Sequence, residues 1–232
     1  MSQIKKLLAA AVAGIALAGS AAAGSVGFKF SVVTTTAARN ALGLATSAAG
    51  NSGPNLTSDA ATANTPYVLI ESIGTSAATL DGFSFTIGAS RFFDFVIRES
   101  GYNNLTWAQV SPGSPDNNDN GVAGQAPISP TMSYTFGGFN AGERFSAQTD
   151  VDAGSLNLTQ LLAAISGKTV MANFSNGRSL SASFASAPVE TAPGVYSVQA
   201  SVVPLPTAGW AGLALMGTCG VMQYRRKLAL QA

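Results

Sequence analysis

The sequence predicts a mainly β protein whose centre is a single antiparallel β-sandwich of jelly-roll-like type. The first observation is a succession of short segments with alternating apolar and polar residues, spaced by about ten residues as in known sandwiches. The second is composition, because charged residues make up only 10% of the chain. Gly, Ala, Ser, Thr and Asn are abundant instead, which favours strands joined by polar loops over the charge-rich profile of disorder. The third is an apolar run near each end of the chain.

The strands are predicted from an alternation of period two. In one of them the alternation slips at Asp81-Gly82, which indicates a turn or a bulge. Gly137-Gly138 predicts a turn, and Asn176-Gly177 is a strong hairpin signal. Residues 34–65 are predicted to form a long loop with a short helix at 37–45. The expected strands are 26–33, 67–73, 79–87, 91–98, 105–110, 132–136, 144–151, 168–175, 178–185 and 194–203.

One short helix is predicted near residues 155–166, where the alternation is replaced by helical spacing. Ser155 is a suitable N-cap and Gly167 a suitable C-cap residue. The apolar residues at helical spacing are Leu158, Leu161, Leu162 and Ile165.

The N-terminal residues 1–23 have the three parts of a signal peptide. Lys5-Lys6 supplies a basic region, and residues 7–19 form a short apolar region. Ala21 and Ala23 occupy the two small-residue positions of an A-x-A cleavage site, so cleavage is expected after Ala23. We therefore expect a signal helix that is removed on export, the alternative being an uncleaved N-terminal anchor.

The C-terminal residues 204–232 have the layout of a second signal. Pro204, Leu205 and Pro206 precede an uncharged, mostly apolar run from 207 to 224. As a helix this run would be about 27 Å long, which suffices for a thin membrane core. The basic cluster Arg225, Arg226 and Lys227 would then stay in the cytoplasm. A transmembrane helix is therefore predicted here.

This C-terminal pattern, over residues 203–228, resembles the PEP-CTERM sorting domain of Gram-negative bacteria in its VPLP-type variant. In that family an exosortase, a membrane transpeptidase-like enzyme, is thought to process the tail, and the carrier proteins are associated with extracellular polysaccharide and biofilm. The resemblance implies an exported protein that is anchored in the inner membrane before processing and lies at the cell surface or outside the cell afterwards. Leu205 stands where the commonest form of the motif has Glu. Residues 138–185 also resemble β-sandwich domains of such sorted proteins.

The predicted division is thus a signal peptide (1–23), a sandwich domain (24–203) and a sorting signal (204–232). The central domain has seven basic and eleven acidic side chains, a net charge of −4, so nucleic acid is not an expected partner. The chain has no His, which excludes His-based triads and His metal sites. Its single cysteine, Cys219, lies in the C-terminal apolar run, so the central domain has no internal disulfide.

Ca²⁺ is the one cofactor for which the sequence offers ligands. Asp116, Asn118 and Asn120 occupy alternate positions before a glycine, as in calcium loops, but Pro127 stands where an EF-hand needs Glu. The alternative is an exposed turn without a metal.

A second acidic group is Asp150 and Asp152, whose carboxylates would share one face of a strand about 6.5–7 Å apart. With Glu143 they could bind Ca²⁺, or the pair could catalyse glycoside hydrolysis. The simpler alternative is a strand end that runs into the N-terminus of the predicted helix.

The sequence therefore predicts a non-enzymatic cell-envelope or extracellular-matrix protein with a structural or adhesive role, associated with exopolysaccharide. One alternative is a carbohydrate-binding module, which requires an exposed aromatic row. The other is a carboxylate-based polysaccharide-degrading enzyme, which requires acids converging in a cleft. The candidate sugar-stacking rings are Tyr67, Tyr102, Trp107, Tyr134 and Tyr196.

Overall fold

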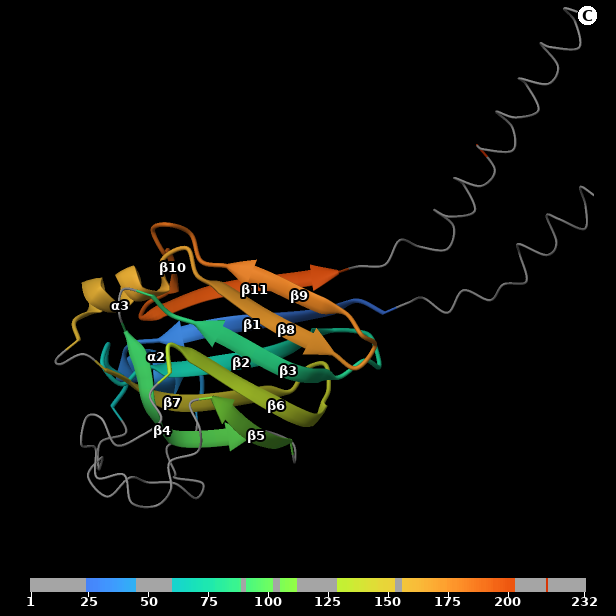
Figure 1. The fold of residues 1–232 in the computed structure, drawn as a ribbon, viewed down its shortest axis with the longest axis horizontal. Coiled ribbons are helices and arrows are strands. Elements are labelled where there is room, and N and C mark those ends of the chain that lie inside the picture. The colour runs from blue at the N-terminus through green and yellow to red at the C-terminus, as the bar shows by residue number, and fades with distance from the viewer. Residues whose placement is uncertain are drawn as a thin grey trace, which may run out of the picture. The chain divides into compact units, whose positions relative to one another are not determined.

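The protein is mainly β, with two antiparallel sheets and two short helices among the residues described by the computed structural model. The sheets form two layers (Figure 1). The unit that contains them runs from Ser25 to Val202. The described residues are 24–44, 60–88, 91–101, 105–111, 129–152, 156–202 and 216.

Sheet A has six strands in the order β10-β11-β1-β2-β7-β4. The first strand of the chain therefore lies in the interior of the sheet, and it pairs with the last strand over its whole length, from Val26 opposite Val202 to Val33 opposite Val195. The strands of sheet A are β1 (Val26–Val33), β2 (Tyr67–Gly74), β4 (Phe92–Gly101), β7 (Arg144–Asp152), β10 (Glu190–Ala192) and β11 (Val195–Val202).

Sheet B has five strands in the order β5-β6-β3-β8-β9. The predicted slip at Asp81-Gly82 is a bulge, because the register of β3 shifts between Leu80 and Gly82 against both neighbouring strands. The strands of sheet B are β3 (Leu80–Thr86), β5 (Thr106–Ser111), β6 (Thr131–Phe139), β8 (Thr169–Phe174) and β9 (Ser179–Ser183).

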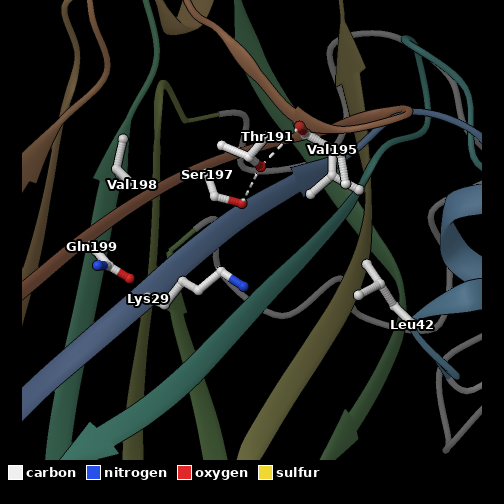
Figure 2. Close-up of a pocket in the computed structure, with 8 residues that line it drawn as sticks. Lys29, Leu42, Thr191, Val195, Ser197, Val198 and Gln199 are labelled. Atoms are coloured by element: carbon white, nitrogen blue, oxygen red, sulfur yellow. Dashed lines mark hydrogen bonds between the residues drawn. The ribbon is translucent and has the colours of Figure 1, made fainter.

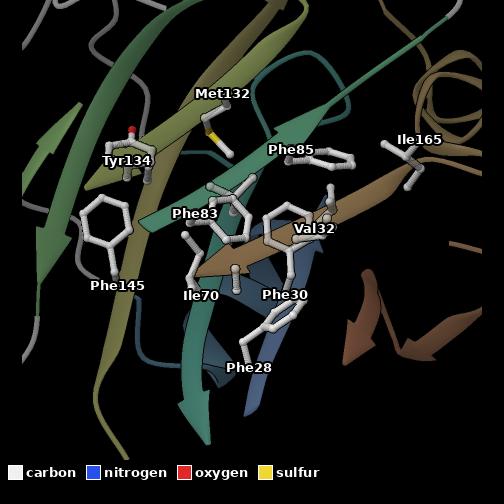
Figure 3. Packing of buried hydrophobic residues seen from close by; sticks show 14 of the residues in the cluster. Phe28, Phe30, Val32, Ile70, Phe83, Phe85, Met132, Tyr134, Phe145 and Ile165 are labelled. Carbon is white, nitrogen blue, oxygen red and sulfur yellow. The ribbon is translucent and has the colours of Figure 1, made fainter. Parts of the chain in front are cut away.

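The core lies between the two sheets and draws on the inward-facing positions of both (Figure 3). The ring of Phe30, from β1 of sheet A, lies 5.1 Å from that of Phe83 and 4.8 Å from that of Phe85, both from β3 of sheet B. All three side chains are buried. Removing one buried ring costs about 3–5 kcal/mol in comparable cores. Since a domain is stable by only about 5–15 kcal/mol, contacts of this kind hold the layers together.

Helix α3 (Leu158–Ile165) confirms the helix predicted near 155–166, but its N-cap is Asn157 and not Ser155. Asn157 Oδ1 accepts from Gln160 N at 2.9 Å, and Gln160 Oε1 accepts from Asn157 N at 3.0 Å. This reciprocal capping box is stronger than a lone serine cap, which explains the shift. The C-cap is Ser166 and not Gly167, and Gly167 follows it with a φ of +65°. Buried Leu161, Ala164 and Ile165 join the core between the sheets.

Helix α2 (Thr36–Ala41) confirms only the first part of the helix expected at 37–45, since Leu42 is already its C-cap. Thr35 is the N-cap, and its hydroxyl accepts from Ala38 N at 3.2 Å.

The hairpins contain one confirmation and two corrections. Asn176-Gly177 joins β8 to β9 as predicted, with Gly177 at a φ of +76°. Gly137-Gly138 is not a turn, because β6 continues to Phe139. The chain reverses at 140–143 instead, where the Glu143 carboxylate accepts from Asn140 N at 2.7 Å. The short strand β10 was not predicted, since its three residues give no periodicity.

No helix among the described residues is long and apolar enough to span a membrane. The predicted signal helix (1–23) lies outside the described residues, and so does the predicted transmembrane run (207–224) except for Met216.

Candidate functional site

The described residues form a groove on the outer face of sheet A. It consists of two adjoining hollows of about 450 and 280 Å³, which share Leu42, Ala192 and Val195 in their walls. We call it the α2–β11 groove, because α2 and the β10–β11 hairpin contribute to its walls. Figure 2 shows the larger hollow.

A second, smaller apolar cluster positions the groove. The outward-facing positions of β1 change from apolar at Val33 to polar at Ser31 and Lys29. The segment with α2 packs on the apolar end of this face, and the polar end is left to line the groove. The buried members of the cluster are Val33, Ala38, Leu44, Ala61, Tyr67, Leu69 and Val195.

The polar end of the groove contains Lys29 together with hydroxyl and amide groups. Lys29 Nζ lies 3.1 Å from a Glu71 carboxylate oxygen, and both side chains are partly exposed. An exposed pair of this kind contributes only about 0–1 kcal/mol, so it leaves Lys29 able to bind another acceptor. Thr191 Oγ1 donates to Ser197 Oγ at 3.1 Å and to the Val195 carbonyl at 3.2 Å (Figure 2).

The β10–β11 hairpin is fixed firmly against the end of β1. Gly194 N donates to the Glu190 carboxylate, and the Gly194 carbonyl accepts from Thr34 N at 2.9 Å. The φ of Gly194 is +74°, a conformation that glycine adopts without strain. Burial raises the pKa of the neighbouring Tyr196, and the negative charge of Glu190 raises it further. The groove therefore has one rigid wall.

The carboxylates of the described side chains are bound to their own fold. Glu71 pairs with Lys29, Glu143 and Glu190 accept backbone N–H groups, and the other two accept from neighbouring side chains: Asp81 from Thr79 at 2.7 Å and Asp150 from Asn64 at 2.9 Å. No carboxylate lines the α2–β11 groove as far as the described residues go. This groove can donate and accept hydrogen bonds, but it presents no general acid or base pair.

Asp150 has a structural contact that the sequence did not reveal. Its carboxylate accepts from Asn64 Nδ2, while Asn64 Oδ1 accepts from Leu156 N at 3.2 Å. In addition, Val151 N donates to the Asn64 carbonyl at 2.9 Å. Asn64 thus ties β7 to the residues just before α3.

Glu143 does not lie beside Asp150 and Asp152, the arrangement that one of the alternatives for this acidic group requires. Glu143 precedes β7, whereas the two aspartates lie at the other end of this strand. Asp150 lies seven steps along the chain from Glu143, about 23 Å in a strand. Asp152 is the last residue of β7, opposite Phe92, and its side chain is outside the described part. Within that part, no three acidic, Cys or His side chains form a group that could hold a metal ion.

The other predicted site residues lie outside the described residues. They are the calcium-loop residues Asp116, Asn118 and Asn120, the cleavage-site residues Ala21 and Ala23, and the sorting-motif residues Pro204, Leu205, Pro206, Arg225, Arg226 and Lys227.

The described rings do not form the aromatic platform that the alternative of a carbohydrate-binding module requires. Tyr67, Tyr134 and Tyr196 are only 1%, 1% and 6% exposed. They are divided between two clusters, because Tyr67 lies under the α2 segment and the other two lie in the core between the sheets. Trp107 is half-buried, with its ring 5.4 Å from that of Phe145. Tyr102 lies outside the described residues.

Sequence reasoning also missed the groove residues Lys29, Thr191, Ser197 and Gln199. The alternation within β1 and β11 contains a signal for three of them, because it places Lys29, Ser197 and Gln199 on the face opposite the core. The register confirms this, with Lys29 opposite Gln199. The position of Thr191 depends on β10, for which no signal exists. No protein-family model, curated protein or solved structure matches the chain.

Proposed function

We propose that this chain is an exported cell-envelope or extracellular-matrix protein with a structural or adhesive role, associated with exopolysaccharide. It loses its signal peptide after Ala23, and an exosortase-type enzyme sorts it through the tail 204–232. Before that step the tail holds it in the inner membrane. The observation that carries the proposal is that Val26, the first residue of β1, pairs with Val202, the last residue of β11.

All described strands lie between these two residues. Removal of 1–23 and of 204–232 therefore takes no strand away from either sheet. A protein that is trimmed at both ends needs such a layout, since what remains must keep its core. The sorting-motif residues begin two positions after the last described strand, so a cut there leaves every described strand whole.

The non-enzymatic part of the proposal is supported by the acidic groups. The described carboxylates each have a partner within the fold, and none of them lines the α2–β11 groove. A carboxylate-based polysaccharide-degrading enzyme would need two acids facing a substrate cleft. A structural or adhesive protein has no such requirement.

We also propose that the two sheets form a single β-sandwich. A single sandwich is supported by one core cluster to which both sheets contribute. A jelly roll has eight strands in two Greek keys, whereas the described part of this chain has eleven strands. The sandwich therefore has more support than the jelly-roll-like order, and an experimental structure would test both.

The test of this function is the fate of both ends in the native host. We expect the extracellular protein to have an intact mass that lacks residues 1–23 and the tail. A Pro204→Ala/Pro206→Ala variant should keep its tail and stay with the membranes, while Arg178→Gln, in an exposed hairpin turn, should behave like the parent. The extracellular protein should also sediment with the polysaccharide of its host. Recovery of the full 1–232 mass from the extracellular fraction would overturn the sorting proposal.

A further inference from the structure

The outer face of sheet B is a surface with little charge in which hydroxyl groups recur from strand to strand. Its middle row runs across four strands, because Ser84 of β3 lies opposite Ser133 of β6 on one side and opposite Met171 of β8 on the other. Met171 in turn lies opposite Ser181 of β9. We call the outward-facing positions of β6, β3, β8 and β9 the hydroxyl face.

Neighbouring side chains of the hydroxyl face are hydrogen-bonded in pairs across the strands. Thr86 Oγ1 and Thr131 Oγ1 lie 2.8 Å apart, and so do Thr169 Oγ1 and Ser183 Oγ. Since strands lie about 4.8 Å apart and every second residue of a strand faces the same way, the face is a grid of about 4.8 by 6.8 Å. Each hydroxyl of the grid keeps capacity to donate or accept toward a ligand.

The near-absence of charged side chains on this sheet is unusual for an exposed surface. The five strands of sheet B, as the structure describes them, contain one charged residue, Asp81. Its carboxylate accepts from Thr79 at the end of β3. By contrast, the outer face of sheet A has Lys29 and Glu71, with Arg144 in register beside Glu71.

The chemistry of the hydroxyl face decides between classes of partner. A charged polymer would lose hydration there without gaining a countercharge. A protein partner would need buried aromatic or aliphatic anchors, yet the exposed large apolar side chains on this sheet are limited to Met171 and Val110 within the described residues. A neutral polysaccharide fits both properties, because its hydroxyls match the hydroxyl grid and its C–H groups match the threonine methyls.

We propose that the hydroxyl face binds a neutral polysaccharide, lying flat across β6, β3, β8 and β9. This inference rests on the proposed function, which associates the protein with exopolysaccharide. It adds that sheet B makes the contact and that the glycan is uncharged. It replaces the aromatic platform as the glycan-binding surface, because three of the described rings of that platform are buried and the fourth, Trp107, is half-buried.

The test is sedimentation and affinity electrophoresis of the full chain in mild detergent. The neutral probes are microcrystalline cellulose and a galactomannan, and the acidic probe is alginate. The test variant is Thr135→Glu/Ser181→Glu, which places two carboxylates on exposed positions of the hydroxyl face. The matched control is Thr159→Glu/Ser201→Glu, with the same change at exposed positions of α3 and β11.

We expect the parent and the control to bind a neutral glycan, and the test variant to bind it at least about tenfold more weakly because a carboxylate buried without a partner is costly. Equal binding by the test variant and the control would overturn the proposal. Binding of alginate alone would overturn the proposal of a neutral glycan but would leave the proposed association with exopolysaccharide in place. Failure to bind any polysaccharide, including that of the host, would overturn the association with exopolysaccharide as well. If the test variant does not fold, Thr86→Val/Thr169→Val removes two hydroxyls at nearly constant shape and should show the same loss.

Discussion

Gly194 offers a sharp test of how the β10–β11 hairpin is built. Its φ of +74° is almost that of Gly177, which has +76°. The two positions differ in their surroundings, because a Cβ at 177 would meet nothing within 4 Å. A Cβ at 194 would overlap Thr35 Oγ1 and would lie 2.9 Å from Thr35 Cγ2.

The difference between the two alanine variants can be worked out from these contacts. Gly177→Ala should cost only the backbone term, about 1 kcal/mol. Gly194→Ala adds the displacement of Thr35, which caps α2 and is worth about 1 kcal/mol in that role, and an overpacking cost of about 1–3 kcal/mol. We therefore expect about 3–5 kcal/mol in total at 194. For a domain of this size, 1 kcal/mol lowers Tm by about 2–4 °C.

The assay is thermal unfolding of the full chain in detergent, followed by far-ultraviolet circular dichroism. Gly177→Ala should lower Tm by about 2–4 °C and Gly194→Ala by at least about 6 °C. In a Thr35→Ala background, which removes both Oγ1 and Cγ2, the extra cost at 194 should shrink, giving a measurable coupling. Equal Tm shifts for the two glycine variants, or full additivity with Thr35→Ala, would refute the reasoning.

Three further predictions concern protonation, a structural amide and calcium. The pKa of Tyr196 is raised in the folded state, so its contribution to stability is complete below pH about 10 and is lost as pH rises through the folded pKa. Tyr196→Phe should therefore flatten the alkaline limb of a curve of Tm against pH. An unchanged alkaline limb would contradict this. Asn64→Ala removes the side-chain hydrogen bonds that Asn64 makes with the Leu156 N–H and the Asp150 carboxylate, so it should cost about 1–3 kcal/mol and speed hydrogen exchange at Leu156. Normal protection of Leu156 in this variant would count against the contact. Millimolar Ca²⁺ should shift Tm little, because the Asp150 carboxylate is already hydrogen-bonded within the fold; a shift of many degrees that Asp150→Asn or Asp116→Asn abolishes would instead identify a calcium site.

The strands could be predicted because sheets with one buried face leave a period of two in the sequence. Phe28, Phe30 and Val32 are buried toward the core, and Lys29 between them is not. The hairpin at Asn176-Gly177 was also predictable, since only a few residue types suit its backbone. The turn after β6 was misplaced because Gly137-Gly138 is a local signal, and the contact between Glu143 and Asn140 competes with it further along the chain.

The candidate sites could be predicted only in part, because they depend on contacts between distant segments. Asp150 has the spacing of a metal ligand or an acid, and only the fold shows that Asn64 lies beside it. The sequence shows the positions of the aromatic residues but not their exposure. Whether a ring such as Tyr67 is exposed depends on the segment that packs over it. The hydroxyl face needs the strand order of sheet B, which periodicity does not contain.

The pairing of the first strand with the last also sets the order in which the molecule can be completed. β1 leaves the ribosome first, yet one of its two neighbours in sheet A, β11, is made last. A chain that emerges through a channel from its N-terminus therefore holds β1 with one open edge until Val202 has passed. Such long-range pairing is slow to form, so the chain stays unfolded while it passes through the channel. A chain that ends before β11 leaves one edge of β1 unpaired, and an unpaired strand edge promotes aggregation.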